Sequence, residues 1–88
     1  MPVRSFPYTL TAHAARVIAA RKIELDWVTR VVSNPARSEP DAEDPELAHA
    51  LGRIPERDDR VLRVVYNNCR SPWLIVTAYF DRRETRRL

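Results

Sequence analysis

The spacing of the apolar residues changes at Asn34-Pro35, and this change constrains the fold more than any other feature of the sequence. Before this point, helical spacing places four apolar side chains on one face, namely Trp27, Val28, Val31 and Val32. Proline cannot continue a helix and restricts the residue before it, so a predicted helix from about Leu25 to Ser33 ends here. From Ala36 onward apolar and polar residues alternate, as they do in β-strands. Helices followed by strands predict an α+β fold.

An earlier segment predicts the first helix, from about Leu10 to Lys22. It is rich in alanine, the strongest helix former, and Thr9 or Thr11 can cap its N-terminus with a side-chain oxygen. Its apolar stripe is formed by Ala14, Val17 and Ile18. Ile23 is expected to close the helix with an apolar contact. The residues before it, Met1–Pro7, are expected to form a loose entry arm.

The rest of the chain predicts strands, which are Ala36–Glu39, Ala48–Ile54, Arg60–Asn67 and Trp73–Asp81. A polar loop at Pro40–Glu46 and two turns separate them. A chain of 88 residues is expected to form one domain, which here spans residues 1–88. We therefore expect two N-terminal helices packed on one face of a three- to four-stranded antiparallel sheet.

Side chains alternate between the two faces of a strand, so the sequence also predicts which residues share a face. The face beneath the helices is expected to hold Leu62, Val64, Leu74, Val76 and Phe80. The open face is expected to hold His49, Arg53, Arg63, Thr77 and Tyr79. Cationic side chains beside an aromatic ring can hold a phosphate and stack a base. A charged face that prevents pairing with other sheets is the alternative interpretation.

The basic residues are almost all arginine. The net charge is +3, and Lys22 is the only lysine among 15 basic residues. The guanidinium group is a rigid fork that matches phosphate, which favours a nucleic-acid or phosphate partner. A GC-rich genome that encodes arginine in place of lysine is the alternative explanation. The acidic loop Pro40–Glu46 lacks the spacing and the glycine of a calcium loop, so a solvated loop and no metal site are expected.

Several classes of protein are disfavoured by the residues that the sequence lacks. Cys69 is the only cysteine, which excludes an internal disulfide and a zinc-finger framework and favours a reducing cytoplasmic setting. Gly52 is the only glycine, so there is no nucleotide-binding glycine loop, and no cofactor is expected. No apolar run approaches the ~20 residues that span a bilayer, so no membrane association is expected.

Six short motifs together resemble a known family. They are T-x-H-A near the N-terminus, R-x-I at 21–23, Asn34-Pro35, H-A-L-G-R-I-P at 49–55, L-R-V-V-Y-N at 62–67 and T-A-Y-F-D-R-R at 77–83. In this order they resemble a family of small uncharacterised bacterial domains related to the BrnT and RelE toxins. The resemblance covers nearly the whole chain. It implies the fold of the barnase-type and colicin-type ribonucleases, and a metal-independent ribonuclease ancestry.

The function that this resemblance implies is a toxin-like, metal-independent endoribonuclease of a bacterial toxin–antitoxin-type system. RNA and an antitoxin protein are then the expected partners. The predicted catalytic residues are His13, His49, Arg53, Arg63, Thr77 and Tyr79, in which one imidazole transfers protons. The predicted phosphate-binding residues are Arg16, Arg21, Arg82 and Arg83. Removal of Arg63 is expected to weaken RNA binding and to leave stability nearly unchanged. A non-catalytic module that binds RNA or protein through the same surface is the alternative.

Overall fold

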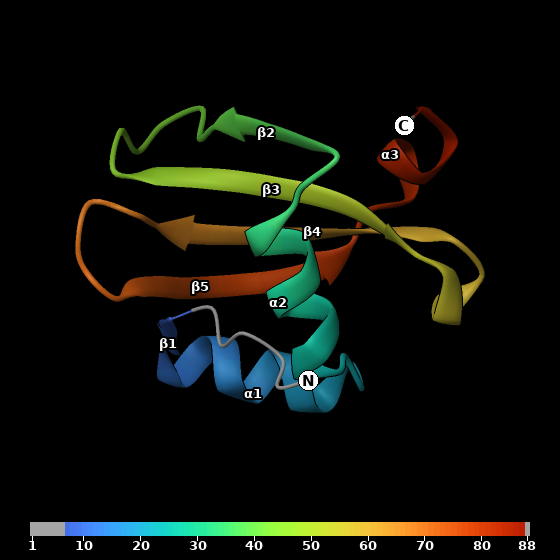
Figure 1. Cartoon of the computed structure of the whole chain (residues 1–88), viewed down its shortest axis with the longest axis horizontal. Helices are drawn as coiled ribbons and strands as arrows, with labels where there is room; N and C mark the ends of the chain where they lie inside the picture. The colour runs from blue at the N-terminus through green and yellow to red at the C-terminus, as the bar shows by residue number, and fades with distance from the viewer. Residues whose placement is uncertain (1–6, 88) are drawn as a thin grey trace, which may run out of the picture.

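The structure is a computed structural model that describes residues 7–87 (Figure 1). The expected entry arm therefore lies outside the described residues, apart from Pro7. The elements in chain order are β1 (Tyr8–Leu10), α1 (Ala12–Ala20), α2 (Leu25–Ser33), β2 (Arg37–Pro40), β3 (Leu47–Ile54), a 3-10 turn η1 (Pro55–Arg57), β4 (Arg60–Asn67), β5 (Trp73–Phe80) and α3 (Arg82–Arg87). The second helix and the three long strands were predicted to within one residue at each end. The strand β1 and the helix α3 were not predicted.

The five strands form one mixed sheet in the order β1-β5-β4-β3-β2. The neighbours from β2 to β5 are antiparallel, whereas β1 runs parallel to β5 and pairs Tyr8 with Trp73 and Leu10 with Ile75. The prediction of a three- to four-stranded antiparallel sheet was therefore wrong in strand number and in the direction of this edge strand. A strand of three residues is too short to give an alternating pattern, and its partner lies more than sixty residues away in the sequence.

The helix arrangement also differs from the prediction, because three helices cover the sheet and not all of them lie on one face. In Figure 1, α1 runs beside β5 and α2 crosses in front of the sheet over β3 and β4. The third helix, α3, packs on the opposite face, where Glu84 reaches the side chain of Arg63. Arg63 points away from α1 and α2, because its neighbours Leu62 and Val64 belong to the core beneath those helices.

Both ends of α1 follow from its sequence. Thr11, one of the two expected N-cap residues, is the N-cap, and its hydroxyl accepts a hydrogen bond from the backbone N–H of Ala14 at 2.9 Å. At the other end, the N–H of Ile23 donates to the carbonyl of Ile18 and places the Ile23 side chain in the core, which confirms its closing contact. This cap requires a left-handed residue, and Lys22 occupies the position with a φ of 57°. The cap holds Arg21 at the end of the helix, facing β5.

The buried core lies between the sheet and the helices α1 and α2, and the predicted apolar face of α2 is confirmed. On the sheet side it contains Ala50, Ile54, Leu62, Val64, Tyr66, Ile75 and Ala78, with Phe80 partly buried against it. Gly52 lets α2 approach β3 closely, since a Cβ atom there would meet Val31 at 3.2 Å.

The predicted face of the first half of β5 was wrong. An irregularity in the pairing of β4 with β5 sets Val65 opposite Thr77 but Tyr66 opposite Ile75, so Val76 is the extra residue. An extra residue in one strand reverses the alternation of side chains beyond it. Ile75 is therefore fully buried under the helices, whereas Leu74 and Val76, which were expected there, are only partly buried.

Candidate functional site

The residues predicted for the open face lie on one face, but the two histidines are not brought together. Strand pairing places Arg63 opposite Tyr79, and it places Val65 opposite both His49 and Thr77. Arg53 lies further along β3 on the same face. His13 lies on α1, exposed to solvent, and α1 is on the other side of the sheet. The predicted grouping of His13 with the residues of the open face is therefore not formed.

Arg63 forms the centre of an ionic cluster on the open face. Its Nε donates to Asp81 Oδ2 at 2.9 Å, and its Nη1 donates to Glu39 Oε2 at 3.0 Å and to His49 Nδ1 at 2.7 Å. Its Nη2 lies 3.7 Å from Glu84 Oε2. Only 8% of the Arg63 surface is exposed. We call this group, formed by Arg63, Glu39, His49, Asp81 and Glu84, the Arg63 cluster.

The ionisation of the Arg63 cluster follows from these contacts. Burial favours the neutral form of Arg63, but hydrogen bonds to Glu39 and Asp81 outweigh it, so the pKa of Arg63 is raised. The hydrogen bond from Arg63 lowers the pKa of Glu39. For Asp81, burial acts to raise the pKa, but the backbone N–H of Glu84 and the Arg63 side chain lower it overall. Glu39 and Asp81 are therefore ionised at neutral pH, and a phosphate would have to displace them to reach Arg63.

His49 has both ring nitrogens occupied. A guanidinium group can only donate, so Nδ1 accepts from Arg63 and the proton is on Nε2. Nε2 donates to Asp41 Oδ1 at 2.7 Å, and this hydrogen bond is the main reason why the pKa of Asp41 falls to about 2. Asp41 Oδ2 also accepts from the backbone N–H groups of Glu43 and Asp44. His49 thus joins the acidic loop to the sheet, and the expectation that this loop is merely solvated was wrong for Asp41.

Two further arginines near the open face also contact groups of the protein, although the buried Nε of Arg37 has no hydrogen-bond partner among the described residues. Arg37 Nη2 lies 2.9 Å from Glu84 Oε1. Arg53 donates to the backbone carbonyls of Asp59 at 2.7 Å and Thr85 at 2.9 Å. These contacts hold α3 and the β3–β4 turn against the sheet. Arginine on this face therefore acts mainly within the protein.

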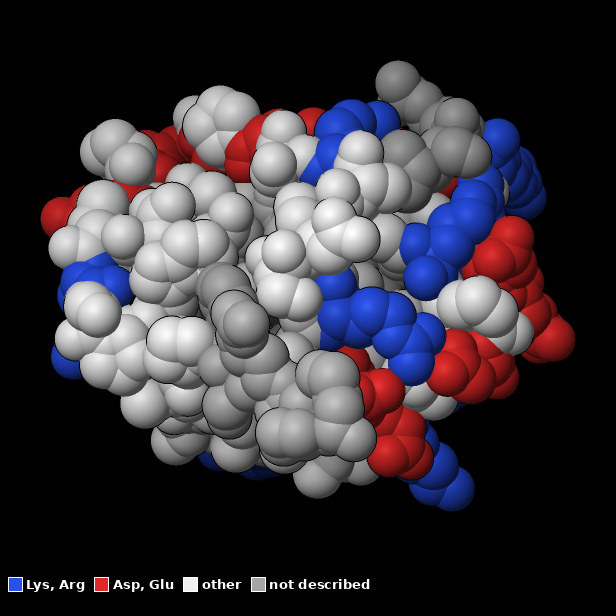
Figure 2. Space-filling model, in the orientation of Figure 1, with Lys and Arg blue, Asp and Glu red and all other residues white. Residues whose placement is uncertain are grey.

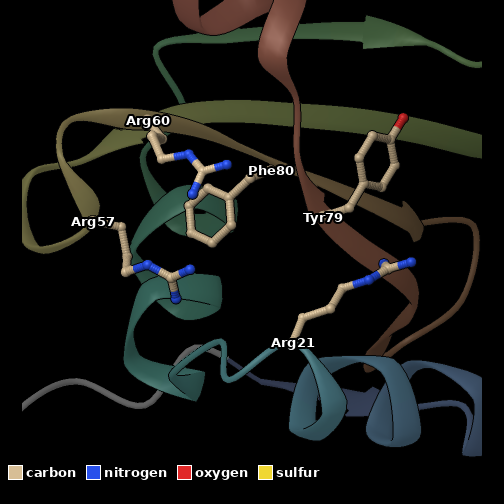
Figure 3. Close-up of a pocket in the computed structure, with 5 residues that line it drawn as sticks. All are labelled: Arg21, Arg57, Arg60, Tyr79 and Phe80. Carbon is tan, nitrogen blue, oxygen red and sulfur yellow. The ribbon is translucent and has the colours of Figure 1, made fainter.

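A second group of arginines lines a pocket of about 470 Å³ at the free edge of β5 (Figure 3). The lining residues are Arg21, Arg57, Arg60, Tyr79 and Phe80, and we call this site the Phe80 pocket. The guanidinium carbon of Arg57 lies 4.9 Å from the centroid of the Phe80 ring, and that of Arg60 lies 5.3 Å from it. Such cation–π contacts hold the two guanidinium groups in place. The pocket lining contains three cations and no carboxylate.

Arg21 enters the Phe80 pocket from the end of α1 (Figure 3). Its Nη1 donates to the carbonyl of Ala78 at 2.8 Å. This carbonyl lies beyond the Trp73–Ile75 segment, which is the part of β5 that pairs with β1. Arg21 therefore satisfies a carbonyl of an otherwise open strand edge and keeps its charge beside the pocket.

Of the carboxylates nearest in sequence to this pocket, Glu56 and Asp59 lie beside other arginines, whereas Asp58 is exposed and forms no ion pair with another described residue. Glu56 accepts from Arg30 Nη1 at 3.0 Å and Nη2 at 2.9 Å, and this pair lowers the pKa of Glu56 to about 2. Asp59 lies 4.0 Å from Arg53. Among residues 7–87, no ion pair joins a carboxylate to any arginine of the Phe80 pocket.

A smaller pocket of about 260 Å³ lies beside α3 and shares one residue with the first. Its lining residues are Arg60, Arg82, Thr85 and Arg86, and we call it the α3 pocket. Of the predicted phosphate-binding residues, Arg21 and Arg82 each line a pocket, whereas Arg16 and Arg83 are exposed and line neither of these two. Figure 2 shows basic side chains gathered on the α3 side, and acidic ones both along the edge that holds the β2–β3 loop and around the β3–β4 turn.

Sequence reasoning missed Arg57, Arg60 and Phe80 as parts of a site. Phe80 was assigned only to the core, and the two arginines were treated as turn and strand residues. A usable signal was present, because antiparallel pairing places the start of β4 beside the end of β5. The position of the arginines of the β3–β4 turn, near the aromatic residues at the end of β5, could therefore have been predicted.

The described residues give no support for a metal site or a membrane span. They contain no group of His, Cys, Asp and Glu side chains that is suited to hold a metal ion. None of the helices described between residues 7 and 87 is long and apolar enough to cross a membrane. Cys69 is exposed and unpaired by any disulfide.

Fold and site together define a small α+β domain with an arginine-lined pocket at one sheet edge. Residues 10–80 match the family model described as "Domain of unknown function (DUF4258)", and the chain belongs to this family. No curated protein and no solved structure matches the chain. The family description names no activity and gives no link to the BrnT and RelE toxins.

Proposed function

We propose that this protein binds single-stranded RNA through the Phe80 pocket. The observation that carries the proposal is the presence of Arg21, Arg57 and Arg60 in one pocket without a carboxylate partner among residues 7–87. Guanidinium groups form bidentate hydrogen bonds with phosphate oxygens. Three of them in one pocket form a site for a backbone phosphate.

The aromatic residues of the pocket support this proposal in different ways. Phe80 orients Arg57 and Arg60 through its ring, so these guanidinium groups lose less freedom when an anion binds. Tyr79 lines the same pocket and is only partly buried, so its ring can stack on a base. Stacking and phosphate contacts do not read base edges, and we therefore expect binding with little sequence preference.

A toxin-like, metal-independent endoribonuclease is a second candidate, and Tyr79 is the residue that favours it. Tyr79 lines the same pocket as the three arginines, and its hydroxyl, which points away from Arg57 and Arg60 in Figure 3, forms no hydrogen bond with another described residue. It can therefore donate a proton to a leaving oxygen while the arginines stabilise the phosphorane charge. His49 can serve as a base only after it leaves Asp41 or Arg63. In this candidate a cytoplasmic antitoxin with an acidic segment covers the arginines.

The proposal is tested by fluorescence anisotropy with a labelled ten-nucleotide oligouridylate at several salt concentrations. Wild-type affinity should fall steeply with salt, because binding releases counterions from the phosphates. Arg57→Gln should weaken binding about tenfold at low salt. The matched control is Arg70→Gln, since Arg70 is exposed in the turn between β4 and β5, at the far end of the sheet. An equal loss in both variants, or no binding by the wild type, contradicts the proposal.

The same oligonucleotide separates binding from cleavage. Incubation of 5′-labelled RNA with the protein in EDTA should leave the RNA intact if the protein only binds it. Cleavage that persists in EDTA and is lost in Tyr79→Phe would establish the ribonuclease candidate. Cleavage that is unchanged in Tyr79→Phe would remove Tyr79 from the mechanism.

A further inference from the structure

Arg60 lines both the Phe80 pocket and the α3 pocket. The two pockets are therefore neighbours within the reach of a single side chain. The guanidinium of Arg60 lies over the Phe80 ring at 5.3 Å, which leaves its N–H donors directed outward around the edge of the planar group. A planar guanidinium group with five N–H donors can donate hydrogen bonds to an anion on each side of it.

The second pocket is built by α3, and the sheet holds this helix in place. Thr85 Oγ1 accepts from the backbone N–H of Val61 at 2.9 Å and donates to the carbonyl of Asp81 at 2.8 Å. Glu84 is only 7% exposed, and it lies 2.9 Å from Arg37. These contacts fix the buried side of α3. The Thr85 hydroxyl is therefore engaged in hydrogen bonds within the protein, and the arginines are the groups of this pocket that can bind a ligand.

Two of these arginines extend from α3 toward the α3 pocket. Arg82 and Arg86 are four residues apart, so they lie on the same side of the helix. Both are exposed, and neither has an ion-pair partner among the described residues. With Arg60 they form a second cationic site whose lining contains no carboxylate.

We propose that the two pockets bind two consecutive phosphates of one RNA strand, with Arg60 placed between them. This inference rests on the proposed RNA binding at the Phe80 pocket. Two phosphates that are close together repel each other, and a shared cation removes much of this repulsion. One phosphate is held by Arg21, Arg57 and Arg60, and the next by Arg60, Arg82 and Arg86. The strand therefore runs from the free edge of β5 toward α3.

The salt dependence of oligouridylate binding measures the number of phosphates that the protein contacts, at about 0.7 in the log–log slope for each phosphate of a single strand. The double variant Arg82→Gln/Arg86→Gln should lower the slope by about 0.7 and still bind RNA. Arg60→Gln should lower it by more than either Arg57→Gln or the α3 double variant. The matched control is Arg16→Gln/Arg70→Gln, which removes the same charge from exposed positions outside both pockets and should leave the slope unchanged.

The outcomes separate this inference from the proposed function. If the wild type binds RNA and the slope is unchanged in Arg82→Gln/Arg86→Gln, the two-phosphate inference is wrong and the Phe80 pocket still stands. If the control double variant lowers the slope equally, binding depends on general charge, and the inference is also wrong. If the wild type does not bind, the proposed function fails first. Thermal melts of every variant, and Arg86→Gln alone, exclude unfolding as the cause of a lower slope.

Discussion

The Arg63 cluster and the Phe80 pocket both contain arginine, but the guanidinium groups have different partners in the two regions. Arg63 is 8% exposed and contacts the carboxylates of Glu39, Asp81 and Glu84, so its charge is neutralised within the protein. The arginines of the Phe80 pocket have an aromatic ring or a backbone carbonyl as their partner, and neither of these cancels a charge. An arginine-rich composition therefore does not locate a phosphate site. The partners of each guanidinium group locate it.

The largest effect is expected when the Arg63 cluster is broken. Arg63→Met leaves Asp81 and Glu84 without their cation in a poorly solvated position, and Glu39 loses its main partner. Removal of one partner from a buried ionic group costs about 3–5 kcal/mol, and we expect a loss near the lower end because Glu39 is partly exposed. Urea denaturation measures this loss. Such a loss would reverse the expectation from sequence, in which Arg63 contributes to RNA binding and not to stability.

A matched comparison sharpens this prediction. Arg57→Met makes the same chemical change at an arginine that has no carboxylate partner among the described residues, and it should cost less than about 1 kcal/mol of stability. Equal costs at the two positions would show that the Arg63 cluster does not stabilise the fold more than the pocket does.

A smaller effect is expected when Phe80 loses its aromatic ring. Phe80→Leu keeps an apolar side chain against Trp27 but removes the cation–π contacts with Arg57 and Arg60. These contacts are worth about 0.5–2 kcal/mol, so RNA affinity should fall by roughly 2- to 30-fold. The salt slope should stay unchanged, because all the arginines remain. A lower slope would mean that the arginines themselves had left the pocket, and unchanged affinity would show that the ring does not orient them.

The smallest effect is expected from Asp41, which joins the acidic loop to the Arg63 cluster through His49. The pKa of Asp41 is lowered from 3.8 to about 2, so its carboxylate stabilises the fold above about pH 4, and this contribution disappears as the pH falls toward about 2. Between pH 5 and pH 2, Asp41→Asn should therefore lose less stability than the wild type does. Parallel pH profiles would contradict this, and oligouridylate binding at neutral pH should be unaffected by the substitution.

The candidate site was only partly predictable from the sequence. Strand parity placed His49, Arg53 and Arg63 on one face, because alternation is a local property of each strand. The predicted face was wrong for Ile75, because the sequence does not reveal that β5 has an extra residue at Val76. The chemistry of the face was also not visible, since the partners of Arg63 lie between 14 and 24 residues away along the chain.

By itself, the sequence determined where most of the helices and strands of this protein lie. The spacing of its apolar residues, the cap at Thr11 and the break at Asn34-Pro35 act over a few neighbouring residues, and they operate before any tertiary contact forms. The tertiary structure decided the parallel edge strand β1, the face of Ile75 and which of the described arginines contact a carboxylate and which contact only a ring or a backbone carbonyl. Each of these depends on pairing between distant segments, and a guanidinium group is available to a ligand only if the fold brings no carboxylate to it.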